Sequence, residues 1–307
     1  MVISFQGNTA NDIWKQAAME LLSDNATFQG SRSGNMSELL HAIISINDPK
    51  QRWVTDRYPP ISIAYALAEL VWILAGSNDA KVINYWNPML PKMAGYYDQY
   101  PGAYGERIRF NYGFDQLERA YHILKNNPHS RQSVILIWDP QRDVPEKDGQ
   151  PINNDIPCNI CSLLKIRNDK LEWTQIMRSN DMFLGLPYNI VQFTSMQEIL
   201  AGWLQLEVGS YTHFSDSLHL YEQHRERLRI VDLADNTNTD SLVIKKDNFY
   251  SVIEEMYSKM ETVCKGGISE FNLCQLTNFQ SSIPQAYQNM MIIIVAYAAR
   301  KNQKSVF

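Results

Sequence analysis

Polar side chains that could do chemistry gather between residues 155 and 224, where they stand among apolar neighbours. They are a thiol, a guanidinium, a hydroxyl, a carboxylate, an amide and a His/Tyr pair: Cys158, Arg178, Ser179, Asp181, Asn189, His219 and Tyr221. Apolar burial alone does not select such groups in such a setting. A thiolate is a nucleophile, and a guanidinium binds phosphate through paired hydrogen bonds. The set therefore indicates an anionic, hydrogen-bonding substrate that is attacked by sulfur.

Four motifs in this stretch follow one another in order: Pro157-Cys158, Arg178-Ser179-Asn180-Asp181, Leu184-Gly185-Leu186-Pro187-Tyr188-Asn189-Ile190 and His219-Leu220-Tyr221. The ordered set resembles the thymidylate synthase family, which includes the nucleotide hydroxymethylases. The resemblance runs roughly from Arg32 to Ile230. It implies an α+β fold with a large mixed β-sheet covered by helices, and a homodimer formed through the sheet face.

The resemblance also implies a nucleophile and a nucleotide site. The Cys158 thiolate would add to C6 of a pyrimidine ring, which turns C5 into a carbon nucleophile. Arg178 would support the thiolate and, with Ser179, bind the substrate phosphate. His219 and Tyr221 would hold the 3′-hydroxyl of the deoxyribose. A single His or Tyr is more often a core residue, but here both belong to an ordered constellation.

Further residues follow from the same resemblance. The cosubstrate would be 5,10-methylenetetrahydrofolate, bound by Asp181, Gly185 and Trp86. Glu69 is the only charge in the apolar stretch from 60 to 76, so it is either paired or functional. It resembles a family glutamate that acts on the base through water. Tyr104 lies in Pro101-Gly102-Ala103-Tyr104-Gly105, which resembles a family turn near the site. Packing under a loop is the alternative for Trp86 and Tyr104.

Two arginines would complete the phosphate site. Arg32 lies in a Gly/Ser-rich turn, and the resemblance implies that it reaches the phosphate. Arg131 matches the first of two adjacent arginines that reach the partner subunit's site, and Gln132 replaces the second. The replacement weakens this clamp or changes what it binds. The site would therefore depend on a homodimer.

The identity of the base and of the product depends on a few positions. Asn189 offers one donor and one acceptor, which complement O4 and N3–H of uracil and favour dUMP. An amide can rotate, so dCMP and CMP stay open. Hydride transfer from the folate would give dTMP, the favoured product, and water would give a hydroxymethyl nucleotide. Asn159, where the synthases have His, and the lack of their apolar tail at Lys304–Phe307 favour the second product.

Two functions of other classes remain as alternatives. A catalytically silent nucleotide-binding protein would keep the pocket without turnover. A redox protein would use Cys158-x-x-Cys161, but the surrounding pattern lacks the βαβ start of a thioredoxin. No second Cys/His pair with convincing ligand spacing follows, so we expect no metal site.

Bulk properties exclude several classes. A net charge of −5 over 307 residues argues against a general nucleic-acid binder. The N-terminus lacks the basic and apolar regions of a signal peptide, and no apolar run reaches the ~20 residues of a membrane span. We expect a cytoplasmic protein.

The elements that must position these residues can be read from periodicity. We expect helices over 9–24, 60–76, 114–125, 188–204, 218–230, 248–264 and 284–300. We expect strands over 133–138 and 207–214, and a hairpin over 161–166 and 171–177. Residues 30–35, 82–104 and 139–155 read as turns or irregular loops. The chain would form a catalytic domain over 1–231 and a divergent helical extension over 232–307 packed on it.

Overall fold

The computed structural model describes residues 2–31, 34–233, 237–279 and 282–302. The chain splits into two compact units. The first unit comprises Met1–Ile61, Leu117–Trp138 and Cys158–Thr239, and the second comprises Ser62–Gln116, Asp139–Pro157 and Asp240–Phe307. Most of the residues with expected chemistry lie in the first unit.

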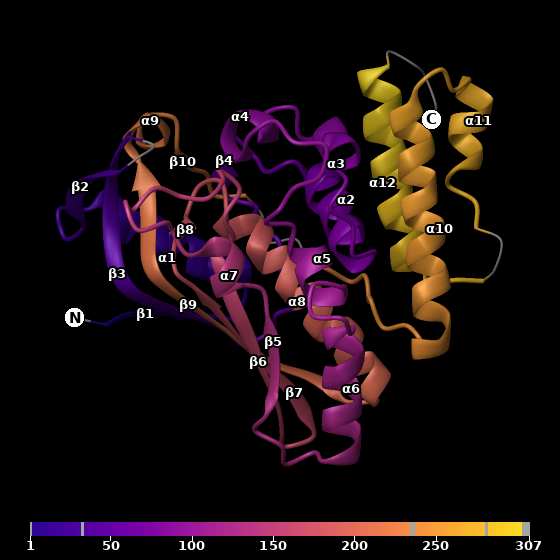
Figure 1. Cartoon of the computed structure of the whole chain (residues 1–307), viewed down its shortest axis with the longest axis horizontal. Coiled ribbons are helices and arrows are strands. Elements are labelled where there is room, and N and C mark those ends of the chain that lie inside the picture. Colours follow the sequence, from indigo (N-terminus) through magenta and orange to yellow (C-terminus); the bar gives the residue numbers. More distant parts are fainter. Residues whose placement is uncertain (1, 32–33, 234–236, 280–281, 303–307) are drawn as a thin grey trace. The chain divides into compact units, whose positions relative to one another are not determined.

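The first unit is built on an eight-stranded mixed sheet (Figure 1). The main order is β1-β3-β9-β7-β6-β5, with β2 beside β3 and β8 beside β9. The strands are β1 (Ile3–Gly7), β2 (Thr27–Ser31), β3 (Gly34–Ile46), β5 (Ser133–Leu136), β6 (Asn159–Arg167), β7 (Lys170–Met177), β8 (Asn180–Asp181) and β9 (Glu207–Tyr221). β7 and β8 run parallel to β9, whereas β3 and β6 run antiparallel to their neighbours β9 and β7. The ends of β7 and β9 and the starts of β6 and β3 therefore meet at one end of the sheet.

The two faces of the sheet differ in burial. One row across five strands is fully buried: Ile135, Ser162, Gln175, His213 and Ile44. The next row points to the other face and consists of apolar residues: Leu136, Cys161, Ile176, Phe214 and Ile43. Most members of this second row are partly exposed, and Leu136 is 43% exposed. We call this row the open row.

Helices cover the buried face. The central one is α8 (Leu186–Leu204), which is buried on nearly every side and packs on β7 and β9. Its Phe193 ring lies 6.4 Å from the ring of Trp173 on β7. α8 also carries buried polar groups with partners: Gln197 donates to the backbone carbonyl of Leu171 at 2.8 Å, and Glu198 pairs with Arg52. α1 (Ala10–Leu22) and α6 (Gln116–Asn126) complete this layer. The α+β expectation is confirmed.

The second unit is helical. Its helices are α2 (Ile63–Leu74), α3 (Ala80–Trp86), α4 (Leu90–Ala94), α5 (Tyr104–Arg109), α7 (Pro140–Asp143), α10 (Lys246–Lys265), α11 (Glu270–Gln275) and α12 (Gln285–Lys301). α10, α11 and α12 lie together (Figure 1), and both α10 and α12 contact the apolar α2. A buried ion pair joins Arg107 to Asp143 at 2.8 Å. No helix in the described part of the chain is long and apolar enough to cross a membrane.

Three local expectations are wrong. β9 continues to Tyr221, so the helix expected over 218–230 is reduced to α9 (Glu222–Arg225). Pairing with β3, as far as Tyr221 opposite Met36, overrides the local helical pattern. The expected irregular stretch over 82–104 contains α3 and α4, and the Asp79 side chain caps the start of α3. Gly34 and Asn35, expected in a turn, already belong to β3.

Candidate active site

Cys158 lies directly before β6, opposite the end of β7. Its carbonyl accepts a hydrogen bond from the backbone N–H of Arg178 at 2.9 Å. This bond continues the pairing of Asn159 with Met177 by one residue. Residues opposite each other in such a ladder have side chains on the same face, with Cβ atoms about 5 Å apart. The guanidinium of Arg178 also lies 5.4 Å from the ring centre of Trp138. The hairpin therefore directs the Cys158 and Arg178 side chains to the same face of the sheet.

The residues after Arg178 form a tight connection into α8. The Asp181 carboxylate accepts from the N–H groups of Phe183 at 2.7 Å and Leu184 at 2.9 Å through one oxygen. Its second oxygen lies 3.9 Å from Nδ1 of His224, a histidine whose pKa burial lowers. Gly185 precedes α8, and a Cβ there would lie 3.1 Å from Oδ1 of Asn180. Asp181 thus holds the loop with one oxygen, while the other faces His224.

Asn189 lies in the first turn of α8 and is only 6% exposed. Its Nδ2 donates to Oδ1 of Asn180 at 3.3 Å and to Sδ of Met177 at 3.6 Å. Neither contact was foreseen from the sequence, because Asn180 occupies the variable position of the Arg-Ser-x-Asp motif. The amide of Asn189 is therefore held from within the protein.

His219 and Tyr221 lie two residues apart near the end of β9. Their rings are in edge contact, with centres 5.0 Å apart. His219 is 5% exposed, its Nδ1 has no hydrogen-bond partner among the described residues, and burial lowers its pKa although Asp181 acts to raise it. β8 beside β9 places Asp181 opposite His219. A neutral imidazole with an unused nitrogen suits a hydroxyl group of a ligand.

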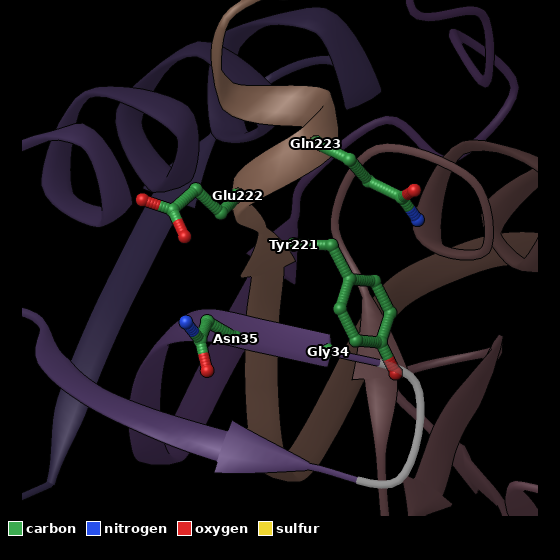
Figure 2. Close-up of a pocket in the computed structure, with 5 residues that line it drawn as sticks. All are labelled: Gly34, Asn35, Tyr221, Glu222 and Gln223. Carbon is green, nitrogen blue, oxygen red and sulfur yellow. The ribbon is translucent and has the colours of Figure 1, made fainter.

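A hollow of about 220 Å³ opens beside Tyr221. Its lining residues are Gly34, Asn35, Tyr221, Glu222 and Gln223. Figure 2 shows the Tyr221 ring running alongside Gly34, with the Glu222 carboxylate and the Asn35 amide on the opposite side. The hollow adjoins the end of the sheet at which the other first-unit residues meet.

The remaining first-unit residues are placed as follows. Ser179 lies directly after Arg178 and is half-buried, so it belongs to the same sheet end. Arg131 is exposed in the loop between α6 and β5. Arg32 lies outside the described residues. The sheet end thus brings together eight of the expected residues: Cys158, Arg178, Ser179, Asp181, Gly185, Asn189, His219 and Tyr221.

Three expected residues belong to the second unit. Glu69 on α2 accepts a hydrogen bond from the Tyr65 hydroxyl at 2.6 Å, so this lone carboxylate is paired. Trp86 ends α3, is 2% exposed and has no hydrogen-bond partner for Nε1 among the described residues. Tyr104 begins α5 and is half-buried.

Asp155 lies in the second unit, three residues before Cys158, and its carboxyl group is held by a backbone hydrogen bond. It accepts from the N–H of Gly102 at 2.7 Å, and burial raises its pKa to about 6. The backbones approach so closely that a Cβ on Gly102 would lie 2.6 Å from the Asp155 carbonyl oxygen. Glycine at this position is therefore required by packing. The described residues contain no group of three or more His, Cys, Asp or Glu side chains that could hold a metal.

Comparison with known proteins supplies the family. A profile of the thymidylate synthase family matches residues 44–262. The chain belongs to this family. The match continues past Ile230, where the motif resemblance ends.

The relatives with similar sequences carry one of two names, deoxyuridylate hydroxymethyltransferase or thymidylate synthase. A deoxyuridylate hydroxymethyltransferase of Bacillus phage SP01 is 30% identical over 71% of this chain, and one of Pseudomonas phage M6 is 31% identical over 64%. A thymidylate synthase of Francisella philomiragia is 27% identical over 68%.

The coverage of these relatives differs. The aligned part spans 58% and 55% of the two phage relatives but 80% of the Francisella synthase. The chain therefore spans little more than half the length of the phage relatives that it matches.

Proposed function

We propose that this thymidylate synthase-family chain transfers a one-carbon unit from 5,10-methylenetetrahydrofolate to C5 of dUMP, giving dTMP. The observation that carries the proposal is the pairing of Cys158 with Arg178, at the same sheet end as Asn189 and His219. The family supplies the reaction class. These residues supply a nucleophile, a cation, an amide for the base and a partner for the sugar.

The proposed chemistry begins with sulfur. The Cys158 thiolate forms a bond to C6 of the pyrimidine, and the displaced electron pair makes C5 a carbon nucleophile. A neighbouring guanidinium favours the thiolate over the thiol, which is the role proposed for Arg178. The C5 carbon then bonds to the folate methylene and loses its proton to solvent. The bond between the methylene and the folate nitrogen breaks, hydride from the folate converts the methylene to a methyl group, and cleavage of the bond between sulfur and C6 releases dTMP and restores the Cys158 thiolate.

The remaining residues bind and orient. Arg178, Ser179, Arg32 and the partner's Arg131 are proposed to hold the phosphate, and His219 and Tyr221 the 3′-hydroxyl. The neutral state of His219 leaves it one acceptor and one donor for that contact. Glu69, Trp86 and Tyr104 keep their proposed roles at the base and the folate.

The residues at the start of α8 fit a pterin ring. The second carboxylate oxygen of Asp181, Oδ2, lies 3.9 Å from Nδ1 of His224. This oxygen can accept a hydrogen bond from a ring N–H or an amino group of the pterin. Gly185 adds no side chain to this corner. The folate supplies the methylene and, for dTMP, the hydride.

A second candidate product is 5-hydroxymethyl-dUMP, formed when water completes the reaction and tetrahydrofolate leaves. The phage relatives at 30% and 31% identity carry that activity in their names. The coverage of four-fifths of the Francisella synthase supports dTMP instead.

The open row supports a homodimer. Five apolar side chains from neighbouring strands lie on a face that stays partly exposed in the single chain. Such a continuous apolar face is typical of an interface between subunits. The chain is thus proposed to form a dimer through this face, with Arg131 serving the partner's site.

We also propose a catalytic domain over residues 1–231 and a helical extension over residues 232–307. We further propose a cytoplasmic location. The four cysteines are free thiols, and free thiols persist in the reducing cytoplasm.

The deciding experiment is incubation with C5-tritiated dUMP and methylenetetrahydrofolate, followed by mass spectrometry of the nucleotide. Tritium release with a methyl gain and dihydrofolate supports the synthase, and release with a hydroxymethyl gain supports the second candidate. A catalytically silent binder releases no tritium. Cys158→Ala should abolish release, and Cys161→Ala should retain it. Full turnover by the Cys158 variant would refute the proposal, and loss in both variants would favour dithiol chemistry.

A further inference from the structure

A buried chain of hydrogen bonds runs from β9 to the base-reading amide. The Tyr211 hydroxyl lies 2.9 Å from Nδ1 of His213, and Nε2 of His213 lies 2.9 Å from Nδ2 of Asn180. Oδ1 of Asn180 then accepts from Nδ2 of Asn189. Tyr211 and His213 are 0% exposed and Asn180 is 2% exposed. We call this set the β9 relay.

The direction of each bond follows from the histidine. Complete burial lowers the pKa of His213 to about 3, so the ring is neutral and has one donor and one acceptor. Since Asn180 turns its NH₂ group to Nε2, that nitrogen accepts and Nδ1 carries the proton. The Nδ1–H then donates to the Tyr211 hydroxyl oxygen. Asn180 is left with its oxygen facing Asn189.

A second self-consistent arrangement exists in principle. If the proton moved to Nε2, both amides would flip and every partner would still be satisfied. Met177 decides between the two. Its thioether sulfur has no hydrogen and can only accept, and it lies 3.6 Å from Nδ2 of Asn189. A flipped Asn189 would place its oxygen against that sulfur and lose this contact.

We propose that the β9 relay, together with Met177, fixes the amide orientation of Asn189 and makes Tyr211, His213 and Asn180 specificity-determining residues for uracil over cytosine. The inference rests on the proposed function of the site. With Nδ2 turned inward, Asn189 presents its oxygen as an acceptor. Uracil has a donor at N3, which matches this oxygen. Cytosine has a lone pair at N3, which opposes it.

An asparagine without fixed partners can turn either its oxygen or its NH₂ group toward a base. The β9 relay leaves Asn189 one of these two orientations. Rotation of Asn189 toward a cytosine would require Asn180, His213 and Tyr211 to reorganise together inside the core. Buried polar groups without partners are costly, so a partial rearrangement is disfavoured. Tyr211, His213 and Asn180 therefore determine which base is bound without contacting the base themselves.

The first test reads the relay directly in the resting protein. Nitrogen NMR of ¹⁵N-histidine-labelled protein should show one of the six histidines neutral down to about pH 4, with its proton on Nδ1. Tyr211→Phe removes the acceptor for that proton without changing ring volume greatly. The Nε2–H form should then appear for the same residue. A wild-type His213 protonated on Nε2 would overturn the proposal whatever the activity of the enzyme.

The second test measures kcat/KM for dUMP and dCMP. We expect a wild-type preference for dUMP of about 100-fold or more, as for sites that read a substrate donor. Asn180→Ala should reduce the ratio to below about 10-fold, because Asn189 can then rotate. Asn180→Asp keeps an oxygen toward Asn189 and should retain the preference. Ser215→Ala removes a hydroxyl 3.5 Å from the same Asn180 nitrogen, outside the relay, and should leave the ratio unchanged.

The outcomes separate the two hypotheses. Folded Asn180→Ala with an unchanged ratio, or a wild-type preference for dCMP, refutes the relay and leaves one-carbon transfer standing. A wild-type enzyme that neither binds nor converts any pyrimidine nucleotide refutes the proposed function and the relay with it. Circular dichroism of each variant identifies any that fails to fold. In that case the NMR measurement on Tyr211→Phe, a variant that retains the packed ring, decides whether the relay exists.

Discussion

The backbone N–H of Arg178 donates to the carbonyl of Cys158 at 2.9 Å, so the proposed nucleophile and the proposed phosphate-binding cation are joined through the main chain. The bond adds one rung to the β6–β7 ladder. The relation between the two side chains is consequently set by a hairpin rather than by a flexible loop.

Arg178→Ala should slow alkylation of Cys158 by iodoacetamide at pH 7 by about tenfold, because the thiolate loses a neighbouring positive charge. A charge-assisted contact to the phosphate would be lost as well, so kcat/KM for dUMP should fall by roughly 10- to 100-fold. Peptide mapping by mass spectrometry reports the alkylation of each cysteine separately. Cys274 provides an internal control, and an unchanged rate at Cys158 would contradict the pairing.

Asp181 serves both the loop before α8 and the proposed folate contact, and substitutions should separate the two. Asp181→Asn retains an oxygen for the N–H groups of Phe183 and Leu184 but loses the negative charge. We expect a stability close to wild type and a raised KM for the folate. Asp181→Ala should in addition lose about 1 kcal/mol of stability, as for a lost helix cap. Urea unfolding and folate titration measure the two effects, and an unchanged folate KM in both variants would exclude the contact.

Asp155 should make stability depend on pH. Its pKa rises from 3.8 to about 6 on folding, so the folded chain binds this proton more tightly than the unfolded chain. The contribution favours folding at low pH and is lost as the pH rises through about 6. Between pH 4 and 7.5 the shift corresponds to roughly 2 kcal/mol.

The variant Asp155→Asn stays neutral and should lack this loss, while its amide oxygen can still accept from Gly102. The free energy of unfolding of wild type and variant, from urea titrations at pH 4 and 7.5, should therefore diverge as the pH increases. Asp148→Asn, an exposed position in the same loop, is the matched control. Parallel pH curves for wild type and Asp155→Asn would show that this carboxyl is not buried in solution.

Arg131 should act across the proposed dimer. Arg131→Ala and Cys158→Ala should each be nearly inactive as pure proteins. After subunit exchange in an equal mixture, random pairing gives mixed dimers with one intact site, so about a quarter of wild-type activity should return. Phe214→Lys in the open row should convert the dimer to a monomer in analytical ultracentrifugation. No recovery in the mixture would mean that Arg131 serves its own chain or none.

The sequence predicted the elements with strong patterns. α2 and α8 are long apolar runs, and the β6–β7 hairpin alternates around a polar turn, so local physics and tertiary structure agree there. β3 and the second half of β9 were missed because each is defined by its pairing with the other, between residues as distant in the chain as Met36 and Tyr221. Asn180 and His213 were missed for a related reason. Their role depends on a hydrogen bond between distant positions, which no local spacing reveals.

The long strand β9 has a consequence for how this protein can change over time. Buried His213 faces α8, its neighbour Phe214 faces the opposite side, and His219 lies further along the same strand. Adding or removing one residue between Tyr211 and His213 would exchange the two sides of everything beyond it. It would move both histidines, Phe214 of the proposed interface and the proposed sugar-binding residues His219 and Tyr221 at once. β9 can therefore accept single amino-acid substitutions during evolution, whereas insertions or deletions within it would be selected against.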